Sequence, residues 1–524
     1  MLAWMAHLGF SLTLDCISRE GGQTGCKEAA RGFPVHRPNI VLIMSDNQPA
    51  DLLGCYGNDE VQSPHIDALA SKGIRFNNAY CVNAMCSPCR ASALTGLMPS
   101  QHGVHNWLDD TLMEHWPQNW SAIGEFDNFP TLIKQAGYTT AMIGKFHLGV
   151  PFEPQLAFDH WVTFPHGHTT SFYDNDVIDQ EKRYRFSGHT VDFFTDKTVE
   201  FLESQKDKER PFFAFVPYNG PYGHWPAIKG RAQNQFADLY DETRMTSIPR
   251  EGLNTKVIDR FGLRLKEGYG EIREQFKGPL LLPNNMESLR NYFSQVSLID
   301  HGVGKIVDTL RQTGQLENTI FIYTSDHGFS LGHNGIWGHG MATWPASTHR
   351  PSFNIPLVIG GGAVSAPTNV CDDMISQIDL FPTLLKVAGV EPPLNVKSSA
   401  NDFSRYLRGG PQSWPEEIYM EQEETRAIRS RKWLYMRRFK GVASHPLEDE
   451  LYDLEHDPFE KTNLIHHGKL SKIGAELSEK ISVFFDNYSV PQFDLWRGGR
   501  AKSNVSYENF WKEAWGEEWH PRLR

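Results

Sequence analysis

The strongest chemical signal in the sequence is a cysteine at the start of a predicted helix. Residues 86–96 read CSPCRASALTG. Pro88 is typical of a first helical turn and Gly96 of the position after a helix, so the segment predicts a helix that begins at Cys86. The helix dipole favours negative charge at Cys86, and Arg90 lies about one turn further along.

Two other interpretations of these cysteines are open. Cys81, Cys86 and Cys89 could contribute to a zinc site, or Cys86 and Cys89 could form a redox pair. A zinc site needs a fourth ligand at suitable spacing, and the sequence has no second cysteine pair. The redox interpretation lacks a thioredoxin-sized context around the motif.

Short apolar runs alternate with amphipathic stretches along the chain. The runs of strand length are Ile40–Met44, Thr139–Ile143, Phe212–Val216, Thr319–Tyr323 and Ile355–Ile359. The helix-like stretches include Ile66–Lys72, Thr131–Ala136, Val191–Ser204, Leu289–Arg311 and Ile375–Ala388. This alternation predicts an α/β fold with a large, mostly parallel sheet flanked by helices. Such sheets bind ligands at the carboxyl ends of their strands.

Four of these strands end in side chains that can bind metals or transfer protons. The ends are residues 45–48 (SDNQ), 144–147 (GKFH), 217–224 (PYNGPYGH) and 325–328 (SDHG). One aspartate after a strand is as often a helix N-cap, but four such ends at one sheet edge indicate a functional site. Lys145 and His147, two residues apart on an extended segment, are expected to point the same way.

The character of the sequence changes near residue 396. Short strands with charged turns are predicted around residues 419–420, 427–429, 433–436 and 450–454, with a helix over Lys469–Tyr488. We therefore predict a catalytic α/β domain over 37–395, a smaller C-terminal α+β subdomain over 396–490 and a Trp-rich tail over 491–524. Residues 1–36 are interpreted as a leader, either a degenerate signal peptide or a disordered segment, since Met1–Leu14 is apolar but lacks a basic start.

Composition excludes several classes of protein. The 524 residues are 40% hydrophobic, which is ample for a packed core, and the net charge is −12. A general nucleic-acid or anionic-membrane binder would need the opposite sign, so an anionic substrate must be met by locally placed cations. The seven cysteines do not form a disulfide scaffold at this length, and no apolar run is long enough to span a bilayer.

The motifs together resemble those of a known family. Cys86-x-Pro-Cys-Arg followed by Leu-Thr-Gly is similar to the signature of the formylglycine-dependent type I sulfatases, a branch of the alkaline phosphatase superfamily. The resemblance extends over most of the chain, in the family's order. It includes Asn39–Asp46 and residues 54–58 (GCYGN), 144–149 (GKFHLG), 325–328 (SDHG), 331–335 (LGHNG), 450–454 (ELYDL), 457–458 (DP) and 463–464 (NL).

The resemblance implies an alkaline-phosphatase-like fold and a sulfuric ester hydrolase. It implies that a separate maturation enzyme converts Cys86 to Cα-formylglycine. One hydroxyl of the hydrated aldehyde would attack sulfur and displace the alcohol, and the second would lose its proton as sulfate is expelled. Periplasmic or extracellular location is common for such enzymes of polysaccharides, but the leader does not decide the compartment.

The resemblance also implies a metal site. Its ligands would be Asp46, Asn47, Asp326 and His327 together with the modified Cys86. A mainly oxygen-donor set favours Ca²⁺, with Mg²⁺ or Mn²⁺ as substitutes. Many relatives have a second aspartate where this chain has Asn47, and asparagine where it has His327. These departures lower the charge of the ligand set and weaken the assignment of Ca²⁺.

The remaining roles follow from the resemblance and from side-chain chemistry. Arg90 and Lys145 would contact the hydrate and the sulfate, His147 would be the base for collapse, and His224 would be the acid for the leaving alcohol. Relatives usually have lysine after Trp337-Gly338, where this chain has His339. Histidine could replace that lysine only while protonated, which predicts a loss of activity on the alkaline side.

The substrate is expected to be a sulfated carbohydrate. Four tryptophans and four cations near the motifs favour a sugar over a bare aryl sulfate: Trp107, Trp225, Trp337, Trp344, Lys229, Arg231, Arg244 and Arg250. Each tryptophan is at least as consistent with a core role, and the further histidines His166, His168, His333 and His349 are more consistent with structural roles. Two alternatives are a phosphonate monoester or phosphodiester hydrolase of the same superfamily and a non-catalytic binder of sulfated glycans.

Overall fold

The structure, a computed structural model, is built around a ten-stranded sheet. It describes residues 37–522 except 267–273, 367–368, 392, 394–396, 409 and 411–412, so the predicted leader lies outside the described residues. The strand order is β12-β2-β11-β8-β1-β7-β3-β4-β5-β6. The bounds are β1 Asn39–Asp46, β2 Ile74–Tyr80, β3 Thr139–Ile143, β4 His160–Thr163, β5 Asn175–Asp179, β6 Lys182–Phe186, β7 Phe212–Pro221, β8 Thr319–Ser325, β11 Leu357–Gly360 and β12 Val370–Ser376.

The centre of the sheet is parallel and its flanks are mixed. Strands β8, β1, β7, β3 and β4 pair in parallel, as the alternation of strands and helices predicts. Strand β11 pairs antiparallel with both β8 and β2, and β5 pairs antiparallel with β4 and β6. The chain stays at the carboxyl edge between β8 and β11 instead of crossing over a face of the sheet, so β11 returns in the opposite direction. The sheet is therefore less uniformly parallel than predicted.

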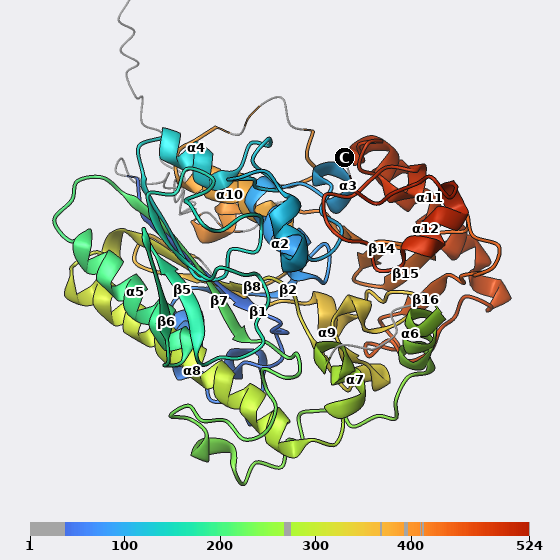
Figure 1. Cartoon of the computed structure of the whole chain (residues 1–524), viewed down its shortest axis with the longest axis horizontal. Helices are drawn as coiled ribbons and strands as arrows, with labels where there is room; N and C mark the ends of the chain where they lie inside the picture. The colour runs from blue at the N-terminus through green and yellow to red at the C-terminus, as the bar shows by residue number, and fades with distance from the viewer. Residues whose placement is uncertain are drawn as a thin grey trace, which may run out of the picture.

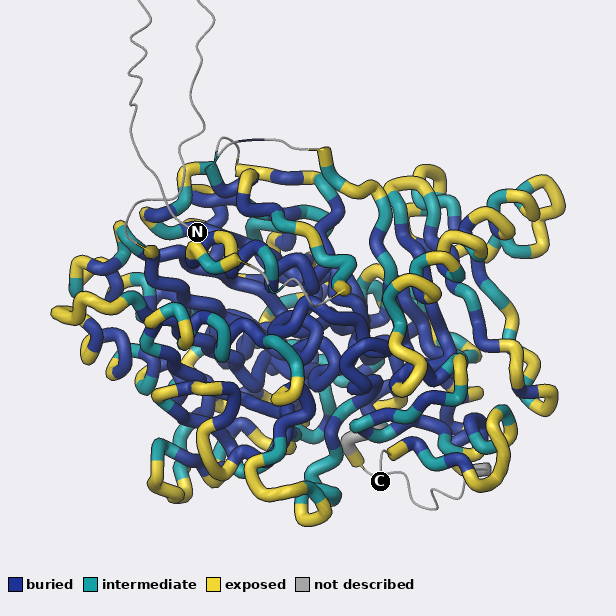
Figure 2. The backbone as a smooth tube through the Cα atoms, turned by 90° about the horizontal axis from the view of Figure 1, so that it is seen from above, coloured by how far each residue is buried: buried dark blue, intermediate teal, exposed yellow. Residues whose placement is uncertain are grey.

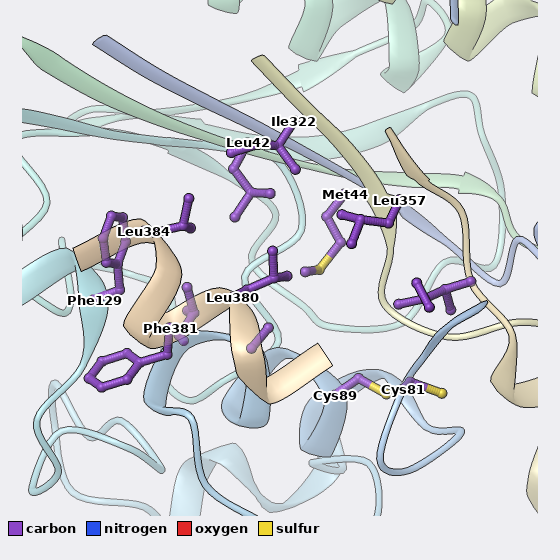
Figure 3. Packing of buried hydrophobic residues seen from close by; sticks show 14 of the residues in the cluster. Leu42, Met44, Cys81, Cys89, Phe129, Ile322, Leu357, Leu380, Phe381 and Leu384 are labelled. Atoms are coloured by element: carbon purple, nitrogen blue, oxygen red, sulfur yellow. The ribbon is translucent and has the colours of Figure 1, made fainter. Parts of the chain in front are cut away.

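Alternate residues of β1 pack on opposite faces of the sheet. Leu42 and Met44 lie in one core cluster, and Val41 and Ile43 lie in the other. Helices α2 (Cys86–Thr95), α4 (Phe129–Gln135) and α10 (Leu380–Val387) cover the first face, whereas α1 (Pro64–Lys72), α5 (Thr190–Ser204) and α8 (Met286–Gln312) cover the second (Figure 1). Figure 3 shows Leu42 and Met44 facing Leu380. The predicted helix Ile375–Ala388 is wrong at its start, because residues 370–376 pair with β2 as strand β12.

The C-terminal region contains a smaller antiparallel sheet. Its strands are β13 Glu417–Gln422, β14 Thr425–Ser430, β15 Trp433–Arg438 and β16 Glu450–Asp453, and helix α11 (Ser471–Tyr488) packs on β14 and β15. The predicted fold class is confirmed. In the tail, α12 (Glu508–Trp515) places Trp511 in a cluster with Trp344.

Buried backbone runs through the main sheet, and exposed residues lie on the peripheral loops (Figure 2). Among the described residues, no helix combines the length and apolar character needed to cross a membrane.

Buried neutral histidines make the stability of the fold depend on pH. Burial lowers the pKa of His189 to about 4 and holds the pKa of His102 well below its ordinary value of 6.5. The unfolded chain therefore binds protons that the folded chain excludes, once the pH falls below the unfolded pKa. As the pH falls from about 6.5 towards its folded pKa, each such histidine is expected to lower the free energy of unfolding by ~1.4 kcal/mol per pH unit, and its contribution stays constant above pH 6.5.

Urea unfolding across this pH window measures the slope. His189→Gln is expected to reduce the slope by the contribution of one proton, because the amide can still face Gln295, the partner of His189 at 2.8 Å. The control His467→Gln changes an exposed histidine and is expected to keep the wild-type slope. An unchanged slope in His189→Gln would contradict this account.

Candidate active site

Two carboxylates meet at the carboxyl edge because β1 and β8 are parallel neighbours. Ser45 is in register with Ser325, so Asp46 and Asp326 follow at the same level. Both side chains are fully buried. The next residue, Asn47, has a φ of 64°, and its backbone N–H donates to Asp326 Oδ1 at 3.2 Å. The chain turns sharply at this point and brings the Asn47 amide to the same edge.

The cysteine of the motif lies beside these carboxylates. Helix α2 begins at Cys86 and ends before Gly96, which has a φ of 69°, as the sequence predicts. The Cys86 Sγ atom lies 3.6 Å from Asp46 Oδ1, 3.5 Å from His327 Nε2 and 3.5 Å from Lys145 Nζ. The thiol is 5% exposed, and burial, followed by the Asp46 charge, raises its pKa well above the ordinary value. A free thiol is therefore kept protonated here and is poorly suited to act as a nucleophile.

Two cations lie between the carboxylates. Arg90 Nη2 is 3.0 Å from Asp46 Oδ2 and 2.8 Å from Asp326 Oδ2, and Lys145 Nζ is 2.6 Å from Asp46 Oδ2. Burial alone would raise the pKa of Asp46, but Lys145 and Arg90 outweigh it and hold that pKa well below its ordinary range. All four side chains are fully buried, so the ion pairs fix one another in place.

The residues at this edge fit a divalent cation. Ligand atoms of Asp46, Cys86, Asp326 and His327 all lie within 4.8 Å of one another. The Asn47 Oδ1 and Nδ2 atoms are buried without hydrogen-bond partners. His327 Nδ1 faces the Gly328 carbonyl oxygen at 2.8 Å, and a proton on Nδ1 leaves Nε2 available as a ligand. The two carboxylates and two cations cancel in charge, so an added divalent ion would make the edge attractive to an anion.

The structure does not support the zinc and redox interpretations of the cysteines. Among the described residues, the cluster of potential metal ligands around Cys86 includes neither Cys81 nor Cys89. Cys89 is fully buried in the core, its thiol donates to the Asn83 carbonyl, and Cys86 and Cys89 are both free thiols. Figure 3 shows Cys89 beside Cys81 at the edge of the core.

A pocket opens above Cys86, and two histidines line it. The rings of His224 and His339 are 4.9 Å apart, and His339 is 5.5 Å from the ring of His327. Burial lowers the pKa of His224 to about 3 and that of His339 far below 6.5. Since His339 Nδ1 accepts a hydrogen bond from the Met341 N–H at 3.3 Å, its neutral form has the proton on Nε2. In the free protein His339 is thus neutral, with the Nε2 hydrogen available for donation.

His147 does not lie on an extended segment with Lys145. Strand β3 ends at Ile143, and His147 has a φ of 49°, so the expectation that both side chains point the same way from an extended chain is wrong. His147 Nε2 faces the Leu108 carbonyl oxygen at 2.9 Å, and its Nδ1 is buried without a hydrogen-bond partner.

Sequence reasoning missed the surroundings of His147. Its ring is 5.0 Å from that of His168, and His168 Nδ1 is 3.1 Å from Asp110 Oδ2. Tyr222, in the strand end at 217–224, was given no role from the sequence; its ring lies 4.9 Å from Lys145 Nζ. The Asp110 side chain caps no predicted element, so no sequence signal connects it to the site.

The other expected aromatic and cationic residues divide between the pocket and the scaffold. Trp107, Trp337 and His168 line the pocket, whereas Trp344 packs in the C-terminal cluster. The cations that the sequence suggested for the substrate, Lys229, Arg231, Arg244 and Arg250, are absent from the described lining, where Arg260 is found instead. Arg231 pairs with Asp238 and Asp241 at the surface.

Of the remaining histidines, His349 pairs with the buried Glu460 at 2.8 Å, His333 lies 3.8 Å from Asp51, and His166 stacks on Phe164. These contacts agree with structural roles.

Comparisons with known proteins identify one family over most of the chain. A family profile described as Sulfatase matches residues 38–390, and one described as N-sulphoglucosamine sulphohydrolase, C-terminal, matches residues 346–486. An N-acetylglucosamine-6-O-sulfatase of Bacteroides thetaiotaomicron is 29% identical over 499 residues, which is 84% of this chain and 85% of that protein. An ulvan-active sulfatase of Formosa agariphila is 26% identical and covers 90% of this chain and 88% of its own.

A solved structure has a similar fold over the same range. It is described as a complex with its substrate D-glucosamine-2-N,6-O-disulfate. It is 26% identical, has a TM-score of 0.69 and covers 86% of this chain and 98% of its own.

Proposed function

Because the chain belongs to the sulfatase family and is a sulfuric ester hydrolase, we propose that Cys86, converted to formylglycine, is the group that attacks the sulfate ester of a sulfated sugar. One observation supports this most strongly: the Cys86 side chain lies at the N-terminus of α2, within 3.6 Å of Asp46, His327 and Lys145. A thiol with a raised pKa has little use at such a position, whereas a hydrated aldehyde supplies an oxygen nucleophile and a second hydroxyl for release of sulfate.

In this proposal a divalent cation would be held by Asp46, Asn47, Asp326 and His327. Their carboxylate and amide oxygens favour Ca²⁺, and Mg²⁺ or Mn²⁺ are the alternatives. When bound, the ion supplies positive charge that favours the ionised hydroxyl at Cys86 and the sulfate oxygens. The unpartnered amide of Asn47 supports its inclusion as a ligand.

The fixed cations hold the sulfate group. Arg90 and Lys145 are already positioned by Asp46, so their remaining donors meet the anion without reorganisation. Tyr222, over the ammonium of Lys145, restricts where Lys145 can reach.

Three histidines accept protons or donate hydrogen bonds to the reacting groups in this proposal. His147 Nδ1 has no hydrogen-bond partner among the described residues and is the atom that takes the proton of the second hydroxyl. His224 and His339 stand together in the pocket and donate hydrogen bonds to the leaving oxygen and to a sulfate oxygen. His339 can do so as a neutral imidazole, whereas the leaving oxygen needs a proton, which His224 takes up when the anionic substrate fills the pocket and then transfers as the alcohol departs.

A sugar is the substrate that fits the pocket best. Trp107 and Trp337 line it, and flat aromatic side chains pack well against the apolar faces of sugars. The relatives named above act on N-acetylglucosamine 6-sulfate and ulvan by their names, and the related structure contains a disulfated glucosamine. We therefore propose a sulfated carbohydrate as the substrate of this chain.

A side-by-side assay of four substrate types tests this function. We expect the matured protein to hydrolyse 4-nitrophenyl sulfate with a kcat/KM at least about tenfold above that for the matching phosphate monoester, phosphate diester and phosphonate monoester. A preference for the diester or the phosphonate would favour the rival hydrolase class. No hydrolysis of any of the four, together with binding of a sulfated glycan, would favour the non-catalytic alternative.

A further inference from the structure

Two arginines lie on the inward face of helix α6 (Thr255–Lys266), about one turn apart. Arg260 and Arg264 are each only 5% exposed, whereas Ile258 and Leu265 of the same helix are 55% and 57% exposed. An amphipathic helix ordinarily turns its apolar side chains inward and its charges outward. The inward face of α6 also holds the apolar side chains of Val257, Phe261 and Leu263, so Arg260 is a charge placed among buried apolar groups, and its position needs an explanation.

The helix is held firmly in this orientation. The Lys256 carbonyl oxygen accepts a hydrogen bond from the Trp344 N–H at 2.9 Å, and Lys256 Nζ pairs with Glu450 at 2.6 Å. Figure 1 shows α6 beside β16, the strand that contains Glu450. The arginines therefore cannot turn outward without breaking contacts with two other parts of the chain.

The buried guanidinium of Arg260 has no counter-charge within the described part of the chain. No ion pair joins it to a described carboxylate, and its Nη1 atom is buried without a hydrogen-bond partner. The acidic group that faces it is the Tyr507 hydroxyl, which stays neutral because burial raises its pKa to about 12. Burial, together with Arg264, lowers the pKa of Arg260 to about 10, so the side chain remains charged at neutral pH. Buried charges in proteins are otherwise paired, because an unpaired one is costly.

Arg260 lines the same pocket as the proposed catalytic groups. The pocket is bounded by Cys86, His224, His339 and Arg260, with apolar walls between them. Arg260 and Arg264 are both close enough to His339 to lower its pKa. Arg260 is the only arginine or lysine among the described lining residues, and the reacting sulfate is met by other cations, Arg90 and Lys145.

We propose that Arg260, supported by Arg264, is an anion-binding subsite for a second acidic group of the substrate, a sulfate or a carboxylate near the scissile sulfate ester. A guanidinium can bind either group through two parallel hydrogen bonds. Because Arg260 is already desolvated and fixed, the interaction costs little reorganisation. This proposal rests on the proposed function and narrows it to sugars with at least two anionic groups.

Three small sulfonates test the subsite as competitive inhibitors of 4-nitrophenyl sulfate hydrolysis. Benzenesulfonate has one anionic group, benzene-1,3-disulfonate adds a second sulfonate, and 3-sulfobenzoate adds a carboxylate. We expect at least one of the two dianions to inhibit the wild type about tenfold more strongly than benzenesulfonate. The tighter dianion indicates whether the second group is of the sulfate or the carboxylate type. In Arg260→Gln this ratio is expected to fall to about one.

The measured quantity is the ratio of the inhibition constants of benzenesulfonate and the tighter dianion. A variant that weakens the binding of all three inhibitors equally leaves this ratio unchanged. Arg405→Gln, which removes an exposed arginine, is the matched control and is expected to keep the wild-type ratio. A wild-type ratio near one, or an unchanged ratio in Arg260→Gln, would overturn the proposal.

Thermal unfolding distinguishes this role from a structural one. Without ligand, Arg260→Gln is expected to melt at the same or a higher temperature than the wild type, because a buried charge is removed. A melting temperature lowered by several degrees would show that the charge is compensated within the protein and would overturn the subsite.

If the wild type does not hydrolyse 4-nitrophenyl sulfate, the proposed function fails. In that case the subsite is tested by the rise in melting temperature on addition of benzene-1,3-disulfonate or 3-sulfobenzoate. A larger rise in the wild type than in Arg260→Gln would support the subsite, and an equal rise would overturn it.

Discussion

Cys86→Ala is expected to lower kcat/KM for a sulfate ester by at least about 10⁴-fold, because it removes the proposed nucleophile itself. The loss should appear in kcat, while competitive binding of inorganic sulfate is retained, since Arg90 and Lys145 keep their contacts with Asp46. The fold should also be retained, because alanine is compatible with the first turn of α2 and leaves only a small space beside Asp46. Steady-state kinetics of both proteins, prepared in a host that performs the maturation, measure the effect.

Cys89→Ala is the matched control for this experiment. It changes the same residue type in the same helix, but Cys89 packs in the core and its thiol donates to the Asn83 carbonyl. We expect its activity to stay within about threefold of the wild type, with a loss of stability of about 1 kcal/mol. An equal loss of activity in both variants would contradict the assignment of Cys86, since it would indicate a structural effect on α2.

Asp326→Asn is expected to lower kcat/KM by about 10²–10³-fold and to reduce the bound divalent metal per protein chain. The substitution removes one carboxylate of the proposed ligand set and one of the two partners of Arg90 Nη2. The free energy of unfolding is expected to fall by about 3 kcal/mol, because a buried cation loses a counter-charge. Metal analysis of the purified protein, kinetics and urea unfolding measure the three effects.

A buried carboxylate away from the site is the control for Asp326→Asn. Asp300 accepts hydrogen bonds from the backbone N–H groups of His65 and Ile66, and burial raises its pKa to about 7. Asp300→Asn should therefore leave both the metal content and the activity at wild-type values. Removal of metal from the wild type with a chelator should reproduce the activity of Asp326→Asn, and addition of Ca²⁺ should restore it. Full activity of the metal-free wild type would contradict the metal site.

The centre of the site could be predicted because it depends on short sequence patterns and on the rule that neighbouring parallel strands end at the same edge of a sheet. Asp46 and Asp326 directly follow long apolar runs, so their position at the sheet edge requires only that β1 and β8 be parallel neighbours. Helix α2 could be predicted at both ends from Pro88 and Gly96. In each case the decisive interactions lie within a few residues or follow from the general behaviour of parallel sheets.

The surroundings of this centre could not be predicted, because they depend on contacts between residues far apart in the sequence and on backbone conformations without a sequence signal. His147 has a left-handed backbone conformation that no glycine or asparagine indicates at that position. Arg260 reaches the pocket because α6 is fixed by Trp344 and Glu450, which lie far away in the sequence. The charge of its side chain alone would favour a position at the surface. The direction of β11 likewise depends on where the loops after β8 leave the sheet.

The conversion of Cys86 to formylglycine is tested most directly by the mass of the tryptic peptide 76–90 from protein made in its native host. This peptide contains Cys81, Cys86 and Cys89, so fragment ions distinguish the three positions. We expect Cys86 alone to have an aldehyde (CHO) in place of its CH₂SH group, while Cys81 and Cys89 remain thiols. An unmodified thiol at Cys86 in protein that hydrolyses sulfate esters would contradict the central claim.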